Sequence, residues 1–237
     1  MIYGELGRYP LYINASLRCI KYWLRLLKMD RARLPKQAYL MMLEQDKNGK
    51  RNWASAIREL LSKLALETAW NNQEVQEYSP FLRECKTKMY NLFLQGWKID
   101  IRASERYSLY RECTPFFGQI SYIDNIAIYC FRVALTQLRT GVLPLNSNMN
   151  RYGENPTRSY CPICKNVVED EKHFMFDCPA YDELRNRFLF NMSVQNLPEL
   201  LCIEFNAWSL NVAKFTFHSM KKRSQLIDRA EVELVDT

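Results

Sequence analysis

The chain has 237 residues, 48% of them apolar and 25% charged, so it is long enough to bury a hydrophobic core as one large or two small domains. Its formal net charge is +7, glycine is scarce (7 residues), and no apolar stretch reaches the roughly 18 residues that span a bilayer. This composition argues against disorder, a membrane span, a secretory signal and a glycine-rich doubly wound sheet, and it predicts a mostly α protein with reduced thiols in the nucleus or cytoplasm.

The positive charge is concentrated at the N-terminal end, where residues 1–60 contain 12 Lys and Arg against 5 Asp and Glu. After Pro10, apolar residues recur at helical spacing from Ile13 to Leu27 and predict an amphipathic helix. A basic strip runs beside them, formed by Arg18, Lys21, Arg25 and Lys28. Such a strip suits contact with nucleic acid or an acidic partner, and an ordinary solvated helix face has the same pattern.

Three more helices are predicted in the following stretch. One begins near Pro35 and ends in the turn at 46–49, and the next is capped by Asn52. From residue 81 to about 111 the pattern predicts what would be the longest helix. Its basic residues, at i, i+4 and i+8 on one face, are Lys98, Arg102 and Arg106. The apolar run at 120–138 predicts one buried helix that ends at Thr140-Gly141.

The chain is therefore predicted to have four segments. They are a basic N-terminal helical region (1–142), a polar loop (143–159), a small cysteine- and histidine-containing module (160–190) and C-terminal helices (191–237). The last helix is expected from about residue 207 to 227, with a frayed end after it. The predicted fold class is an irregular helical bundle with a small embedded CCHC zinc module.

The module carries the pattern Cys161-x2-Cys164-x8-His173-x4-Cys178. Two residues between thiols allow a tight turn to aim both sulfurs at one ion, and an imidazole and a third thiol follow after a short loop. Three thiolates and a histidine form a closed structural zinc site, one ion per chain, with no open position for an activated water. The alternative is that three cysteines and a histidine fill the core by coincidence.

Local backbone geometry must bring His173 and Cys178 together, since an ideal helix would set them about 140° apart. Pro179 disfavours helical geometry at the residue before it, so we expect Cys178 to leave a single helical turn and close the site. Asn166 is expected to adopt the left-handed conformation in the first turn. The acidic residues 169–171 are expected to form the solvated tip of the loop.

No other pattern in the sequence indicates catalysis. There is no glycine-rich phosphate loop, nucleophile elbow, HExxH motif or adjacent aspartate pair. His218 has no carboxylate or cysteine at partner spacing and is interpreted as a surface or interface residue. We therefore expect no enzymatic activity and no small-molecule substrate.

The zinc pattern belongs to a longer block, formed by residues 158–164 and 168–181 followed by Leu184 and Arg185. Written as a pattern, the block reads CPxC, ED, HFxFxCPxY, LR. It resembles the zinc-binding region that follows the polymerase domain in the reverse transcriptases of non-LTR retrotransposons. Residues 3–11, 22–23 and 52–53 also resemble the stretch between polymerase and zinc module in transposon-derived open reading frames.

The resemblance implies that Cys161, Cys164, His173 and Cys178 are the metal ligands and that the module assists binding of template RNA or target DNA. The catalytic aspartates of the polymerase and a recognisable endonuclease are absent, so the chain resembles a terminal fragment or a truncated copy. The predicted function is weak, non-specific binding of RNA or DNA through phosphates by a non-catalytic, retrotransposon-derived zinc protein. The alternatives are a scaffold for protein partners and a retrotransposon remnant without function.

Overall fold

The structure is a computed structural model that describes residues 2–114, 116–153, 155–190, 196–202 and 207–235. These residues form helices and loops and contain no β-strand, only the isolated bridges Leu6–Gln119 and Tyr160–Val168. The mostly α class is thus confirmed. None of the described helices is both long enough and apolar enough to cross a bilayer. The chain divides into two compact units: unit 1 comprises residues 1–8 and 99–237, and unit 2 comprises residues 9–98.

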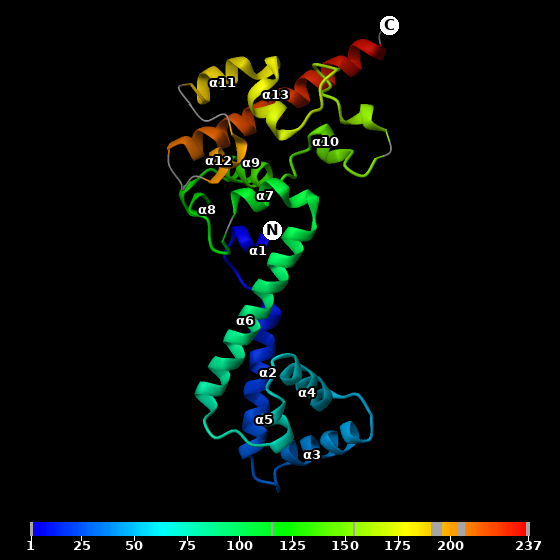
Figure 1. Cartoon of the computed structure of the whole chain (residues 1–237), viewed down its shortest axis with the longest axis vertical. Coiled ribbons are helices and arrows are strands. Elements are labelled where there is room, and N and C mark those ends of the chain that lie inside the picture. Colours follow the sequence, from blue (N-terminus) through cyan, green and yellow to red (C-terminus); the bar gives the residue numbers. More distant parts are fainter. Residues whose placement is uncertain (1, 115, 154, 191–195, 203–206, 236–237) are drawn as a thin grey trace. The chain divides into compact units, whose positions relative to one another are not determined.

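Unit 2 contains the N-terminal helices of the chain. They are α2 (Leu11–Lys28), α3 (Leu34–Lys47), α4 (Trp53–Lys63), α5 (Glu67–Asn72) and the larger part of α6 (Tyr78–Ala103). Helices α3 and α4 pack against α2 and against each other, and α5 packs against α4 (Figure 1). The helices predicted after Pro10, from Pro35 and after the Asn52 cap are confirmed as α2, α3 and α4.

The core of unit 2 is built on the apolar face of α2, where Ile13, Ile20 and Trp23 are fully buried. The Trp23 indole N–H donates to the Tyr39 hydroxyl at 2.8 Å, which satisfies a polar atom that would otherwise be costly inside the core. Helix α4 begins with the predicted cap, because the Asn52 side chain accepts from the N–H groups of Ala54 and Ser55.

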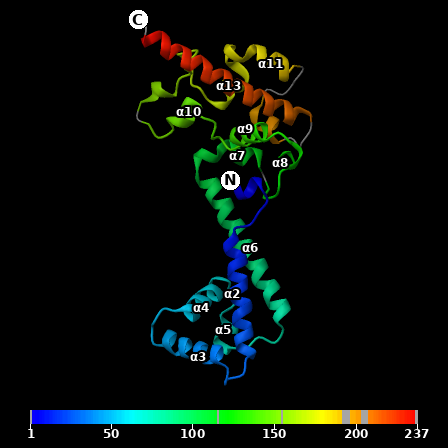
Figure 2. The same cartoon turned by 180° about the vertical axis from the view of Figure 1, so that it is seen from behind.

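Unit 1 contains the remaining elements. They are α1 (Ile2–Glu5), η1 (Glu105–Tyr107), α7 (Ser108–Cys113), α8 (Tyr122–Asn125), α9 (Tyr129–Arg139), α10 (Asn146–Met149), η2 (Pro156–Ser159), η3 (His173–Asp177), η4 (Pro179–Tyr181), α11 (Asp182–Phe188), α12 (Leu197–Cys202) and α13 (Ala207–Val235). Helix α12 packs against α7 (Figure 1). Helix α13 packs against α9 and α11 (Figure 2). Helix α13 is therefore the helix around which the core of unit 1 packs.

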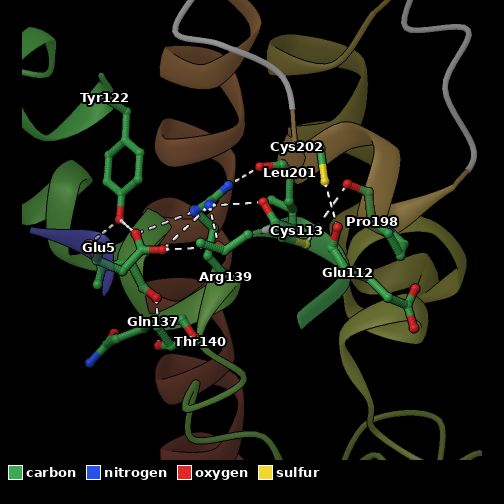
Figure 3. Close-up of polar contacts among 12 residues, drawn as sticks. Glu5, Glu112, Cys113, Tyr122, Gln137, Arg139, Thr140, Pro198, Leu201 and Cys202 are labelled. Carbon is green, nitrogen blue, oxygen red and sulfur yellow. Dashed lines mark hydrogen bonds and ion pairs between the residues drawn. The ribbon is translucent and has the colours of Figure 1, made fainter. Parts of the chain in front are cut away.

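A buried ion pair lies in the core of unit 1, between Glu5 in α1 and Arg139 at the end of α9 (Figure 3). Their side chains are 2% and 4% exposed, and the closest nitrogen–oxygen distance is 3.4 Å. The Tyr122 hydroxyl also donates to Glu5, at 2.5 Å. These contacts satisfy the Glu5 carboxylate inside an apolar environment.

Three predicted helix boundaries are wrong. The helix predicted from 81 to about 111 ends at Ala103, and Arg111 donates to the carbonyls of Ile101 and Arg102 at that end. The helix predicted at 120–138 is instead divided into α8 and α9, and Arg132 donates to the carbonyl oxygen of Ile126 at the end of α8. In both places an arginine that follows in the chain satisfies carbonyls that a continuous helix would have paired.

The third boundary is that of the last helix, which continues to Val235 in place of the expected end near residue 227. The segment 143–159, predicted as a loop, contains the short helices α10 and η2. The two compact units also divide the chain differently from the predicted segments 1–142, 143–159, 160–190 and 191–237. Unit 1 includes the loop, the cysteine- and histidine-containing module and the C-terminal helix.

Candidate metal centre

The first half of the candidate site is a tight turn that carries Cys161 and Cys164. It is closed by a backbone hydrogen bond from Cys161 N–H to the Val167 carbonyl at 2.7 Å, next to the bridge between Tyr160 and Val168. Within the turn, Lys165 has a φ of +64°. The left-handed residue is therefore Lys165, and the assignment to Asn166 was wrong. The Cys164 N–H also lies 3.5 Å from the Cys161 sulfur, which orients that sulfur.

The second half is a wide helical turn from His173 to Asp177, of the π type. The Cys178 N–H donates to the His173 carbonyl at 2.8 Å, an i→i+5 bond that brings the two ligands onto one side. Cys178 itself is extended (φ −69°, ψ 116°). The expectation that this residue leaves the helix before Pro179 is confirmed.

The four side chains converge on one point in unit 1. All four ligand atoms of Cys161, Cys164, His173 and Cys178 lie within 4.8 Å of one another. The Cys164 and Cys178 sulfurs are 3.8 Å apart. Two thiolates on a tetrahedral zinc ion with bonds of about 2.3 Å would be about 3.8 Å apart. The cluster can therefore hold one metal ion.

The histidine provides an independent test of that fit. His173 is 5% exposed, and neither of its ring nitrogens has a hydrogen-bond partner among the residues that the structure describes. A buried imidazole without partners is costly, and a metal bond from one nitrogen would satisfy it. The donor set of three sulfurs and one imidazole nitrogen suits zinc and other soft cations better than calcium or magnesium.

Burial also makes two thiols of this cluster, those of Cys164 and Cys178, weaker acids. It raises the pKa of Cys178 to about 12 and raises the pKa of Cys164 above its usual range. A bound divalent cation favours the thiolate form and compensates the negative charge. Binding of a metal ion by this cluster would therefore release protons.

Polar groups outside the cluster hold the turns in place. The Asp170 carboxylate accepts from the His173 N–H at 2.7 Å, which caps the turn that presents the imidazole. Arg185 donates to the Cys178 carbonyl and pairs with Asp182 at 2.6 Å. Arg185 was part of the sequence block but had no assigned role, because its partner is a backbone atom.

Glu169 is the largest departure from the expectation for this module. It was predicted at a solvated tip, but it is 1% exposed. Both of its carboxylate oxygens accept from Arg223 in α13 at 2.7 Å, and one also accepts from the Asn146 N–H at 2.7 Å. The correction has a physical reason: a carboxylate can be buried when several donors satisfy it. The pair fastens the module and the preceding segment to α13.

The basic residues predicted to bind nucleic acid lie on two units. Arg18, Lys21, Arg25 and Lys28 are all exposed on α2. Arg18 and Lys21 border a groove of about 300 Å³ that is also lined by Asn14, Leu17 and Leu82. The Lys28 ammonium lies 4.2 Å from the centre of the Tyr78 ring, so it already has a cation–π partner.

The predicted series of Lys98, Arg102 and Arg106 does not form one helical face. Lys98 and Arg102 are exposed on α6, but this helix ends at Ala103 and Arg106 lies in η1. The charge also separates by unit: residues 9–98 contain 16 Lys and Arg against 8 Asp and Glu, whereas the rest of the chain contains 17 against 18. The whole positive excess thus belongs to unit 2.

Comparison of the chain with protein-family models, with curated proteins and with solved structures finds no match.

Proposed function

We propose that this chain is a non-catalytic zinc protein that binds RNA or DNA through phosphate contacts with little sequence preference. The zinc part rests on one observation: the ligand atoms of Cys161, Cys164, His173 and Cys178 converge within 4.8 Å, and the His173 imidazole has no hydrogen-bond partner among the described residues. One ion per chain would be held by these four side chains. Its role would be structural, because four protein ligands complete a tetrahedron and leave no position for water.

The nucleic-acid part is supported by charge. Unit 2 has an excess of eight positive charges, and α2 presents Arg18, Lys21 and Arg25 to solvent without an acidic partner among the described residues. Basic side chains that follow one helix face can contact successive phosphates and release counterions. Phosphate contacts do not distinguish bases, so we expect low sequence preference.

The resemblance of the 158–185 block to retrotransposon reverse transcriptases supports the same proposal, since the zinc modules of that family assist RNA or DNA binding. The proposal includes the absence of polymerase and nuclease activity, because no constellation of acidic residues for magnesium was found in the sequence. Primer extension or strand cleavage that persists in pure protein, and is lost on substitution of one carboxylate, would refute this part.

Metal analysis of purified protein tests the zinc part. We expect one zinc ion per chain in the wild type and none in His173→Ala, which keeps all three cysteines. His218→Ala is the matched control, because it removes the other histidine and should retain the zinc. A wild-type protein that is fully folded without metal, and equally resistant to protease across residues 160–190, would refute the zinc site.

Fluorescence anisotropy tests nucleic-acid binding with single-stranded RNA and duplex DNA at 50 to 200 mM salt. The strip variant Arg18→Gln, Lys21→Gln, Arg25→Gln should bind at least tenfold more weakly. Its log–log salt slope should be less steep by about 0.7 to 0.9 for each lost contact.

The control variant Lys47→Gln, Lys50→Gln, Lys63→Gln removes the same charge from exposed positions of unit 2 outside the strip. It should weaken binding much less. If both variants lose affinity equally, only net charge matters and the strip is not a binding face. If the wild type does not bind at 50 mM salt, the nucleic-acid proposal fails and a protein scaffold or a functionless remnant replaces it.

A further inference from the structure

Two cysteines outside the metal centre lie at adjoining helix ends in unit 1. Cys113 is the last residue of α7 and is 3% exposed, whereas Cys202 is the last residue of α12 and is exposed (Figure 3). Each thiol reaches the other helix: the Cys202 sulfur lies 2.9 Å from the Glu112 carbonyl oxygen, and the Cys113 sulfur lies 3.8 Å from the Pro198 carbonyl oxygen. Helices α7 and α12 pack against each other, so the two thiols lie in the same small region of unit 1.

Arg139 fixes the two helix ends relative to each other. Its guanidinium donates to the Cys113 carbonyl at 3.4 Å and to the carbonyl of Leu201, the residue before Cys202 (Figure 3). The same guanidinium is held by the buried Glu5. The backbone at both cysteines is therefore anchored to one buried side chain, which holds the two helix ends beside each other.

We propose that Cys113 and Cys202 form an intramolecular disulfide when a small disulfide such as glutathione disulfide is available. The Cys202 thiolate attacks one sulfur of glutathione disulfide, its S–S bond breaks, and one glutathione leaves as a thiolate that takes up a proton. Cys113 then loses its proton and attacks the Cys202 sulfur, which releases the second glutathione. Two protein thiols are oxidised to one disulfide, and one glutathione disulfide is reduced to two glutathiones.

The environments of the two thiols match this order of events. Cys202 is open to a solvent-borne disulfide, whereas Cys113 is shielded and can react only with a neighbouring sulfur. Burial raises the pKa of Cys113 well above its usual range, while the Arg139 guanidinium opposes that shift and would favour the thiolate during the second step.

The cross-link would join α7 to α12 and close a loop of about 90 residues that includes the whole metal centre. Closing a loop of this length restricts the unfolded chain, so the thermal midpoint of unit 1 should rise by about 5 to 10 °C. Oxidation would thereby stabilise the unit that contains the zinc module without using any of its four ligands.

In the test, the zinc-loaded 237-residue chain is treated with glutathione disulfide under native conditions, the remaining thiols are alkylated, and the peptides are mapped without reduction. We expect a cross-linked peptide pair containing Cys113 and Cys202, with both thiols lost to alkylation. The same pair should form in Cys130→Ser, which removes another thiol from the same tryptic peptide as Cys113. It should be absent from Cys202→Ser, whose substitution at an exposed position should not prevent folding.

Two results would overturn the proposal. One is a stable glutathione adduct on Cys202 while Cys113 remains reduced. The other is a cross-link that forms only in urea, because the folded structure would then not bring the sulfurs together. Reduction with dithiothreitol should restore the original melting temperature if the disulfide is the cause of the shift.

Discussion

Substitution of Arg223 by methionine tests the buried ion pair, Glu169–Arg223, that fastens the cysteine- and histidine-containing module to α13. The change keeps most of the apolar side-chain length but removes the guanidinium. The Glu169 carboxylate would then stay buried with only the Asn146 N–H donating to it. An unpaired carboxylate in this environment must be neutralised, hydrated by local opening, or kept at a large cost.

The size of the effect follows from the geometry of the pair. The Arg223 and Glu169 side chains are 10% and 1% exposed, and two hydrogen bonds of 2.7 Å join them. Removal of one partner from a buried pair costs about 3 to 5 kcal/mol. Since Arg223 retains some solvent contact and Asn146 still donates, we expect about 3 kcal/mol of unfolding free energy to be lost from unit 1.

Amide hydrogen exchange resolved by segment is the suitable assay. Four of the five tryptophans lie in residues 9–98, so fluorescence would mostly report on unit 2. A loss of about 3 kcal/mol should accelerate exchange of the most protected amides of α9 and α13 by roughly 100- to 200-fold. Arg229→Met is the matched control: it makes the same substitution at an exposed position of α13 and should change exchange by less than threefold.

The double variant Glu169→Gln, Arg223→Met separates the two explanations for a loss of protection. If the cost comes from the unpaired carboxylate, neutral glutamine should recover at least half of the lost free energy. Wild-type exchange rates in Arg223→Met would refute the claim that the Glu169–Arg223 pair stabilises unit 1. A double variant that is no more stable than Arg223→Met would refute the claim that the unpaired carboxylate causes the loss.

Three further predictions concern other parts of the chain. Chelation of the proposed zinc ion should expose amides of residues 160–181 to rapid hydrogen exchange, while residues 9–98 remain protected because unit 2 has its own core. Hydrogen exchange measured before and after addition of the chelator tests this. Asn52→Ala should destabilise unit 2 by about 1 kcal/mol in urea unfolding followed by tryptophan fluorescence, with exposed Asn48→Ala nearly neutral. Burial first, and then the neighbouring Arg187, Lys221 and Lys214, lower the pKa of His218, whose ring stacks on Phe188 at 5.4 Å. As the pH falls, His218 is therefore protonated in the unfolded chain before it is protonated in the folded chain, so the stability of unit 1 should fall as the pH falls through about 6.5. Thermal melts of His218→Phe should show a smaller fall.

The convergence of Cys161, Cys164, His173 and Cys178 was predicted from spacing alone, because the geometry of this cluster is local. Cys161 and Cys164 share one turn, and His173 and Cys178 share another. The proline after Cys178 was enough to predict that this residue leaves the helix. The left-handed residue was misplaced by one position, at Asn166, because propensity favours asparagine there but the turn closes around Lys165.

Helix boundaries were predicted less well wherever a distant side chain ended the helix. The sequence at Ala103 contains no proline or glycine, and the end of α6 is marked by Arg111 from the next helix, which donates to its last carbonyls. Arg132 has the same role after α8. Such ends depend on where a later segment folds back, so periodicity could not reveal them.

Amphipathic helices, the Asn52 cap and the ligand spacing follow from residues within a few positions of one another, and so the amino-acid order alone specifies them. The burial of Glu169 depends on Arg223, 54 residues away, and that of Glu5 depends on Arg139, 134 residues away. From the sequence alone, a carboxylate is predicted to be exposed at the surface, because its removal from water is unfavourable. Only the folded chain brings the guanidinium that compensates the buried charge, and only there do the helix ends that carry Cys113 and Cys202 pack against each other.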